Sequence, residues 1–266
     1  MTRNFEIAIE AAVNGGKSIL DIYDSHEDFN IQTKADQSPL TSADQAANQI
    51  ITEVLAQTGI PIISEENKQT DYDIRKHWER CWIVDPLDGT KEFIKRNGEF
   101  TVNIALCEGG VSVMGIIYVP VSRELYYGSI PMRKSFKTVL NAMHEAEYGF
   151  FKELDRIQPA SPPTDRIRVV GSRSHMNAET EAFLQTLKTQ FQEVEIVSKG
   201  SSLKFCLIAE GKADLYPRYA PTMEWDTAAG SAIVEALGIQ VLSRVTNLPM
   251  RYNKEELLNP HFLVCR

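Results

Sequence analysis

The sequence predicts an α/β protein in two parts, an α+β domain over residues 1–158 and an alternating α/β domain over residues 159–266. In the first part, apolar residues at helical spacing are followed by apolar, β-branched runs that short turns join. In the second part, helical and extended segments alternate. Between the two parts, residues 158–163 contain three prolines, which cannot sustain a helix or a central strand.

Two helices are predicted in the first part. Apolar residues recur at helical spacing between Ile9 and Tyr23, so one face of the first helix should pack on a core. The second helix should begin near Thr41 and end at Gly59, because a glycine can adopt the left-handed conformation that closes a helix. The run Ile31–Lys34 between them is predicted to be a strand.

Apolar, β-branched runs predict a mainly antiparallel sheet in the rest of the first part. The pair Gly109 and Gly110 is a hairpin signal. The pattern predicts no element between Met132 and Asp155. The predicted strands are Ile60–Ile63, Cys81–Val84, Phe100–Leu106, Val111–Val119 and Glu124–Tyr127.

The second part is predicted to alternate strands with helices, an order that is typical of an α/β layer. Gly211 and Gly238 stand where helix C-termini are expected. The predicted segments, strand first, are Ile167–Val170, Ala178–Phe191, Val194–Val197, Leu203–Glu210, Asp214–Tyr216 and Asp226–Leu237.

Composition restricts the classes of function. With 266 residues and 43% hydrophobic content, the chain can fill a large core without disulfides. The net charge of −8 argues against a protein that binds a nucleic-acid polymer through a basic surface. The four cysteines show no C-x-x-C pairing and are predicted to be buried, reduced thiols. No signal peptide or membrane-spanning run is visible, so we expect a cytoplasmic protein.

The segment Trp82–Phe93 predicts a site for a metal and a phosphate. An apolar strand would carry Asp85 at its end, and Pro86 cannot continue the ladder. Asp85, the Leu87 carbonyl and Asp88 then offer oxygen ligands on one bend, which suits Mg²⁺. Taken alone, the same residue types also fit an ordinary surface turn.

Two further acidic positions favour a shared site. The strand Ile60–Ile63 is followed by Glu65 and Glu66, which repeats the arrangement at Asp85. Asp226 precedes an apolar helix, where an acid more often serves only as an N-cap. One common metal site explains three acidic strand or helix ends more economically than three unrelated roles.

The order of these motifs resembles the lithium-sensitive, Mg²⁺-dependent phosphatases of the inositol monophosphatase superfamily. The motifs are Glu65-Glu66, Asp85-Pro-Leu-Asp-Gly-Thr90 and Trp225-Asp-Thr-Ala-Ala-Gly230, and the resemblance extends from Thr41 to Pro260. Within the superfamily, residues 85–106 and 200–211 are similar to the bacterial 3′(2′),5′-bisphosphate nucleotidases. The chain departs from many members at Ser64, where they carry glycine. The resemblance implies a layered α-β-α-β-α sandwich with the active site between its two domains.

By this resemblance we expect two Mg²⁺ ions, with a weaker third ion beside Glu65 left open. Glu65, Asp85 and the Leu87 carbonyl would hold the first ion. Asp85, Asp88 and Asp226 would hold the second, so that Asp85 bridges the two. The phosphate to be removed is expected to contact Glu65, Leu87, Asp88, Gly89, Thr90 and Asp226, with Lys34 near the entrance and Glu66 behind the metal ligands.

The family also implies how the attacking water is activated. Thr90, held by Asp44, would take a proton from a metal-bound water, and Glu65 would contribute beside them. From the residues alone, Asp44 is explained equally well as a first-turn residue that interacts favourably with the helix dipole, and Thr90 as a turn hydroxyl.

A second patch is expected to bind the nucleotide. In the related nucleotidases a Ser-x-x-Lys and a following arginine contact the nucleotide, and Ser201, Lys204 and Arg218 match them. Gly200 opens the same predicted helix, whose amides can face an anion. His175 would contact the base by resemblance, although a lone histidine before a helix more often serves structure. The alternative is an ordinary helix N-terminus with solvated Lys and Arg side chains.

The resemblance implies hydrolysis of adenosine 3′,5′-bisphosphate to AMP and phosphate, with 3′-phosphoadenosine 5′-phosphosulfate as a second substrate. The implied role is clearance of a by-product of sulfate assimilation. Tyr219 stands roughly where inositol phosphatases carry a glutamate, which counts against inositol phosphate. The alternatives are a phosphatase of inositol phosphates or fructose bisphosphate, and a non-catalytic protein that binds Ca²⁺ or a nucleotide. A monomer or a dimer, and attachment to the cytoplasmic face of the inner membrane, stay open.

Overall fold

The computed structural model describes residues 2–25, 32–33, 39–161, 164–171 and 177–266. Three residues to which the sequence analysis assigns a place, Ile31, Lys34 and His175, lie outside the described residues. The contacts predicted for Lys34 and His175 therefore stay predictions.

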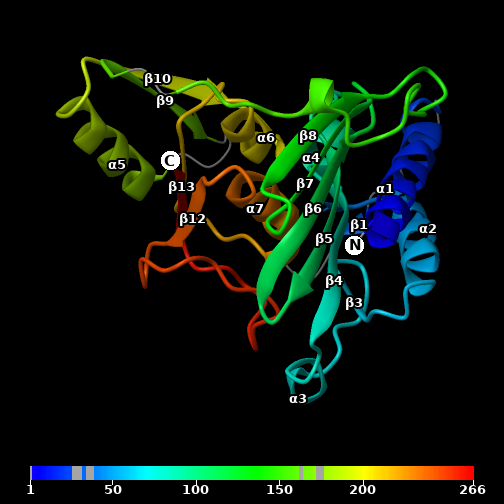
Figure 1. The fold of residues 1–266 in the computed structure, drawn as a ribbon. Helices are drawn as coiled ribbons and strands as arrows, with labels where there is room; N and C mark the ends of the chain where they lie inside the picture. The colour runs from blue at the N-terminus through cyan, green and yellow to red at the C-terminus, as the bar shows by residue number, and fades with distance from the viewer. Residues whose placement is uncertain (1, 26–31, 34–38, 162–163, 172–176) are drawn as a thin grey trace.

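The described residues form five layers (Figure 1). Helices α1 (Thr2–Tyr23) and α2 (Ser42–Ala56) cover one face of a six-stranded sheet. Helices α6 (Leu203–Ala209) and α7 (Ala228–Glu235) lie between that sheet and a five-stranded sheet. Helix α5 (Ala178–Lys188) packs on the outer face of the second sheet. The predicted α-β-α-β-α sandwich is confirmed.

The six-stranded sheet contains every strand that the sequence predicts for it after Thr41. Strands β3 and β4 are parallel and all other neighbours are antiparallel. Gly109 and Gly110, with φ of 55° and 79°, form the predicted turn, because a type I′ hairpin turn needs positive φ at both of its central positions. In spatial order the strands are β3 (Ile62–Ser64), β4 (Arg80–Asp88), β5 (Thr101–Glu108), β6 (Val111–Val119), β7 (Glu124–Ser129) and β8 (Lys134–Val139).

Strand β8 lies in the stretch for which the sequence predicts no element. Its two lysines weaken the apolar pattern by which a strand is predicted, since one of them, Lys137, is held by ion pairs and not by apolar burial. Lys137 Nζ lies 2.6 Å from Glu124 Oε1 and 3.2 Å from Glu210 Oε2. Alternation of apolar and polar residues is therefore weak in β8, because ion pairs to distant residues hold part of the strand in place.

The two predicted N-terminal helices are confirmed. The face of α1 that includes Ile9, Ala12 and Ile19 is buried against the sheet, in one core with Trp82 and Tyr118. Thr41 is the N-cap of α2, which ends at Ala56, three residues before the expected Gly59.

Short elements complete the first part. Strands β1 (Gln32–Thr33) and β2 (Pro39–Leu40) pair antiparallel, so the strand predicted over residues 31–34 is seen at its two central residues. The short helices of the first part are α3 (Tyr72–Arg75), α4 (Thr90–Ile94) and η1 (Glu153–Asp155). One more short helix, η2 (Glu224–Asp226), lies in the second part.

The five-stranded sheet contains two strands that the sequence analysis does not predict, β12 and β13. Strand β13 inserts between β11 and β12 and runs antiparallel to both. The predicted strands and helices are all present with shifted ends. In spatial order the strands are β10 (Glu193–Ser198), β9 (Arg166–Gly171), β11 (Leu215–Arg218), β13 (Phe262–Cys265) and β12 (Gln240–Ser243).

The two parts of the chain share a core. Ile117 and Tyr126 of the first sheet belong to the same buried cluster as Phe205 of α6 and Ile233 of α7. The domain boundary at residue 158 stays a prediction. All four cysteines are free thiols, and three of them are buried.

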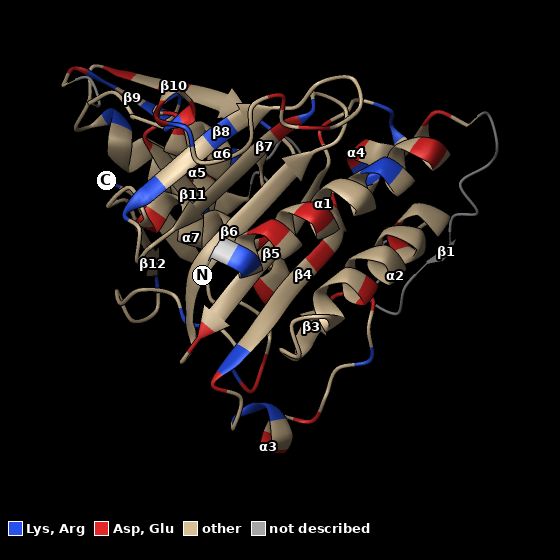
Figure 2. Ribbon diagram, turned by 45° about the vertical axis from the view of Figure 1, so that its right-hand side comes forward, with Lys and Arg blue, Asp and Glu red and all other residues tan. Residues whose placement is uncertain are grey.

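Charged segments of both signs are interspersed along the helices and loops in the view of Figure 2. Within the described ranges, no helix combines the length and the apolar composition that crossing a bilayer requires.

Candidate active site

The ends of β3 and β4 bring two acids together. The strands are parallel neighbours with Ser64 paired to Val84, and the Glu65 amide donates to the Val84 carbonyl at 3.1 Å. Because parallel strands end at the same edge of a sheet, Glu65 and Asp85 emerge side by side. The Ser64 hydroxyl donates to Asn48 Oδ1 at 2.7 Å, so the serine that replaces glycine has a hydrogen-bond partner.

A bulge in β4 places the next acid. Asp85 pairs with Asn103 and Asp88 pairs with Thr101, and the register shifts between them. The ladder therefore resumes after Pro86, which corrects the expectation that the strand ends there. The register shift accommodates Pro86 and Leu87, the two residues between the acids. Pro86 has no N–H to donate to the neighbouring strand.

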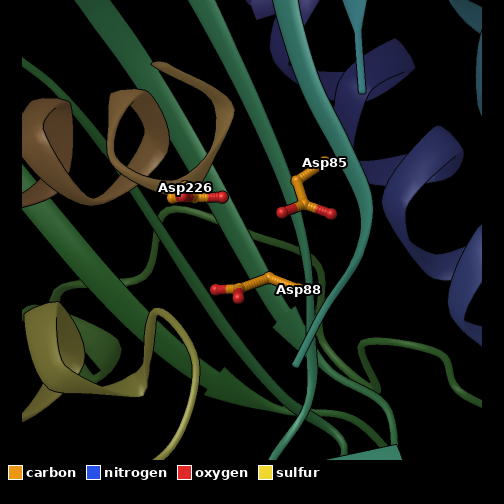
Figure 3. A group of neighbouring side chains, drawn as sticks. All are labelled: Asp85, Asp88 and Asp226. Atoms are coloured by element: carbon orange, nitrogen blue, oxygen red, sulfur yellow. The ribbon is translucent and has the colours of Figure 1, made fainter. Parts of the chain in front are cut away.

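Asp226 completes a cluster of three aspartates. One carboxylate oxygen from each of Asp85, Asp88 and Asp226 lies within 4.8 Å of the others, and Figure 3 shows the three side chains directed into one space. Asp226 ends η2, and its Oδ2 accepts from the Met223 amide at 2.8 Å. The capping role and the place in the cluster therefore coexist. The following helix, α7, begins at Ala228, two residues later than predicted.

Burial and like charge act together on these acids. Burial, followed by the charges of Glu65, Asp88 and Asp226, raises the pKa of Asp85 well above its ordinary value. Burial, followed by Asp88 and Glu65, raises the pKa of Asp226 to about 8. Glu65 thus belongs to the same electrostatic cluster. A set of crowded carboxylate oxygens fits a hard divalent cation, which would replace their mutual repulsion with attraction.

Thr90 and Asp44 meet as the resemblance implies. Thr90 Oγ1 donates to Asp44 Oδ1 at 3.2 Å and lies 3.4 Å from the Leu87 carbonyl. The other oxygen of Asp44 accepts from the Thr41 amide and hydroxyl, at 2.7 and 2.6 Å. Asp44 therefore caps α2 and holds Thr90 at once.

Gly89 gives α4 its sharp start. It has φ of +96°, and a Cβ there would lie 3.1 Å from the Glu99 carbonyl and 3.2 Å from Ser201 Cβ. A side chain is therefore excluded by conformation and by space. Leu87 anchors the same turn, because its side chain is buried in the core while its carbonyl faces Thr90.

A cavity of about 120 Å³ opens beside the aspartates. Lys204 and Arg218 line it together with Asp88 and Asp226. Lys204 is not solvated as an ordinary helix-start lysine would be. It is buried, its Nζ donates to the Ser201 carbonyl and lies 5.6 Å from the centre of the Tyr216 ring, and burial lowers its pKa to about 8.

Three predicted nucleotide contacts are engaged within the protein. Gly200 lines the cavity, but its amide donates to the Glu99 carboxylate, at Oε2, over 2.9 Å, so it is not directed at a substrate phosphate. The Ser201 hydroxyl donates to Asp88 Oδ2 at 2.9 Å. Arg218 donates from Nε and one terminal nitrogen to the carbonyls of Ala220 and Pro221.

Sequence reasoning missed several residues of the cavity region. Glu92 and Tyr216 line the cavity, and Thr101 and Asn103 lie behind Asp88. The last two had a signal, because polar residues inside the apolar run 100–106 are unusual in a buried strand. Tyr219 packs edgewise against His261, with ring centres 5.7 Å apart.

Comparisons with known proteins agree with this geometry. The model of the inositol monophosphatase family matches residues 1–261. The 3′(2′),5′-bisphosphate nucleotidase CysQ of Escherichia coli O6:H1 is 45% identical over 258 residues, which cover 96% of each chain. Its counterpart in Salmonella typhimurium is 44% identical over 97% of this chain and 98% of that one.

A solved structure matches the whole arrangement. The crystal structure of CysQ from Bacteroides thetaiotaomicron, described as a bacterial member of the inositol monophosphatase family, superposes with a TM-score of 0.87. It shares 48% identity and covers 99% of this chain and 97% of its own. Together with the acidic cluster, these matches show that the chain belongs to the inositol monophosphatase family.

Proposed function

We propose that this protein is a Mg²⁺-dependent 3′(2′),5′-bisphosphate nucleotidase that hydrolyses adenosine 3′,5′-bisphosphate to AMP and phosphate. The observation that carries the proposal is a cluster of carboxylates beside a cavity that also holds two cations, Lys204 and Arg218. A substrate with a second phosphate suits that pair of cations. The CysQ relatives, which carry this activity in their names, support it.

Glu65, Asp85, the Leu87 carbonyl, Asp88 and Asp226 would hold two Mg²⁺ ions. When bound, the ions lower the pKa of a coordinated water and neutralise charge on the phosphoryl oxygens. The charges of Glu65, Asp88 and Asp226 all act on Asp85, so its carboxylate is the one that both ions would share.

Thr90 and Asp44 would orient the attacking water. Because Thr90 Oγ1 gives its proton to Asp44 Oδ1, its lone pairs can accept a hydrogen bond from that water. The two bonds from Thr41 fix Asp44, so the pair is set before substrate arrives. As the water attacks, its proton passes to Thr90 Oγ1 while the threonine proton moves to Asp44.

Lys204 and Arg218 would hold the phosphate that is not removed. We further propose 3′-phosphoadenosine 5′-phosphosulfate as a second substrate, inhibition by lithium, and a cytoplasmic role in clearing a by-product of sulfate assimilation. These follow from the family and not from the geometry.

The test compares phosphate release from adenosine 3′,5′-bisphosphate and from inositol 1-phosphate at equal enzyme and Mg²⁺ concentrations. We expect the nucleotide to have the higher kcat/KM. A preference for inositol 1-phosphate would replace this proposal with a sugar-phosphate phosphatase on the same fold. Metal binding without turnover of either ester, or of fructose bisphosphate, would point to a non-catalytic binding protein.

A further inference from the structure

One oxygen of Asp88 is held by three side chains. Ser202 Oγ, Ser201 Oγ and Asn103 Nδ2 lie 2.7, 2.9 and 3.3 Å from Oδ2. No hydrogen bond from the described part of the chain reaches Oδ1. The two oxygens of this carboxylate therefore differ, since the protein occupies one and leaves the other to a ligand.

The donors are themselves fixed. Asn103 and Ser202 are 1% and 2% exposed. Asp88 Oδ2 can only accept, which directs Nδ2 of Asn103 toward it and turns Oδ1 of Asn103 toward Thr101 Oγ1, 2.9 Å away; Thr101 Oγ1 also lies 2.7 Å from Ser201 Oγ. The second amide proton goes to Ser202 Oγ at 2.9 Å. The serine hydroxyl accepts there, so its own single proton is shared between Asp88 Oδ2, at 2.7 Å, and the Asp226 carbonyl, at 2.9 Å.

The network joins segments that are remote in the sequence. Asn103 lies on β5 and Ser202 is the N-cap of α6, 99 residues later. Ser202 Oγ also lies 2.9 Å from the Asp226 carbonyl. One hydroxyl therefore touches both Asp88 and the backbone of Asp226, two of the acids that would share an ion.

We propose that Asn103 and Ser202 are positioning residues for the divalent cation. They hold Oδ2 of Asp88 so that Oδ1 faces the space shared with Asp85 and Asp226. The inference rests on the proposed function only in taking Asp88 as a metal ligand. Groups that hydrogen-bond a ligating carboxylate orient it, and their loss commonly weakens metal binding by about 10- to 100-fold.

The test measures Mn²⁺ binding to the full chain without substrate, by electron paramagnetic resonance of the free ion. The variants are Ser202→Ala and Asn103→Leu, the second of which keeps the branching and the number of side-chain heavy atoms but removes the hydrogen-bonding groups. We expect the dissociation constant of the aspartate site to rise about 10- to 100-fold in each. Ser202→Thr, which keeps the hydroxyl, should recover most of the affinity.

The matched control is Ser135→Ala. Ser135 is as buried as Ser202, and its hydroxyl donates to the Ile233 carbonyl at 2.7 Å and to none of the three aspartates. We expect this variant to bind Mn²⁺ as the unaltered protein does. A loss of affinity equal to that in Ser202→Ala would overturn the proposal, because it would show a general effect of emptying a buried serine site.

A double-mutant cycle separates positioning from stability. In an Asp88→Asn background, Ser202→Ala should change Mn²⁺ affinity much less than it does alone, because the oxygen that it positions is no longer a charged ligand. Equal losses in both backgrounds contradict the proposal. So does unchanged Mn²⁺ affinity in folded Ser202→Ala and Asn103→Leu proteins; if either fails to fold, the other variant and Ser202→Thr decide.

A turnover experiment distinguishes this inference from the proposed function. In Ser202→Ala the Mg²⁺ concentration for half-maximal rate should rise while kcat at saturating Mg²⁺ stays within about threefold. If the unaltered protein hydrolyses no bisphosphate nucleotide, the proposed function fails, but the Mn²⁺ affinities still test the positioning of Asp88.

Discussion

The site has an acidic side, formed by Asp85, Asp88 and Asp226, and a basic side, formed by Lys204 and Arg218. Burial makes the charged form of the buried groups on each side unfavourable. On the acidic side, burial and neighbouring carboxylates raise the pKa of Asp85 and Asp226. On the basic side, burial lowers the pKa of Lys204 to about 8. Both shifts favour the uncharged form until a ligand of opposite charge arrives. This opposition suits a cation on one side and an anion on the other, as the proposed function requires.

The two sides also differ in what holds them. Glu65 follows β3, Asp85 and Asp88 lie in β4, and Asp226 ends a 3₁₀ turn, so backbone hydrogen bonds set the positions of the acids. Lys204 and Arg218 are set by side-chain packing and by bonds to loop carbonyls. Changes on the acidic side should therefore affect chemistry most, and changes on the basic side should affect substrate affinity most.

The largest effect is expected from Asp85→Asn. The variant removes the charge that both proposed ions share, so kcat should fall on the order of 10³-fold, measured as phosphate release from adenosine 3′,5′-bisphosphate. Asp73→Asn, on the exposed face of α3, is the control and should retain full activity. Near-normal turnover by Asp85→Asn in saturating Mg²⁺ would show that the acidic cluster is not the catalytic metal site.

The second largest effect is expected from Thr90→Ala, with a loss of about 10²-fold or more in kcat and little change in KM. The reason is that, in the proposed mechanism, Thr90 Oγ1 orients the water and not the substrate. Thr90→Ser keeps the hydroxyl and should retain most of the rate. Equal losses in both variants would mean that the Thr90 methyl group, and not its bond to Asp44, carries the effect.

Lys204→Met should act on the basic side. We expect KM for adenosine 3′,5′-bisphosphate to rise about 10- to 100-fold with a smaller change in kcat, because a charged hydrogen bond to phosphate is lost. In the unaltered protein KM should rise above about pH 8, where Lys204 loses its proton, and the variant should lack that rise. Lys212→Met, a surface control, should show the unaltered pH profile. A larger loss in kcat than in KM would place Lys204 on the chemical side of the site.

The smallest effect concerns stability without metal. The folded-state pKa of Asp226, about 8, lies above its ordinary value of 3.8, so the folded state binds the proton more tightly than the unfolded state. That contribution to stability is full below about pH 4 and is lost as the pH rises to 8. In a chelator, Tm should therefore fall over this range, by about 2–4 °C for each kcal/mol of this contribution that is lost.

Mg²⁺ should remove most of this fall in Tm, and Asp226→Asn should flatten it in the chelator. Differential scanning fluorimetry at matched ionic strength measures both. A metal-free protein whose stability rises steadily from pH 5 to 8 would contradict the assignment of repulsion to the cluster.

The acidic side could be predicted from sequence because its signals are local. A strand followed directly by acids predicts where Glu65 and Asp85 emerge, and the proline and glycine mark the turn that carries Asp88. The match of Thr90 with Asp44 came from the family resemblance, since 46 residues separate them. No periodicity in the chain could pair them.

The rest depends on contacts between distant segments. Strand β13 is short, and its extended conformation depends on pairing with β11 and β12. The burial of Lys204 and the bond from Gly200 to Glu99 depend on how the residues just before α6 meet β5 and its preceding loop. The polar pair Thr101 and Asn103 was visible as an anomaly in an apolar strand, but only the fold shows that Asp88 is its partner.

The most direct test of the central claim is a crystal structure soaked with Ca²⁺ and adenosine 3′,5′-bisphosphate. The account predicts an ion about 2.3–2.6 Å from oxygens of Asp85, Asp88 and Asp226, with one phosphate on that ion and the other beside Lys204 and Arg218. Density showing Asp226 turned away from Asp85, or both phosphates bound outside this cavity, would contradict it.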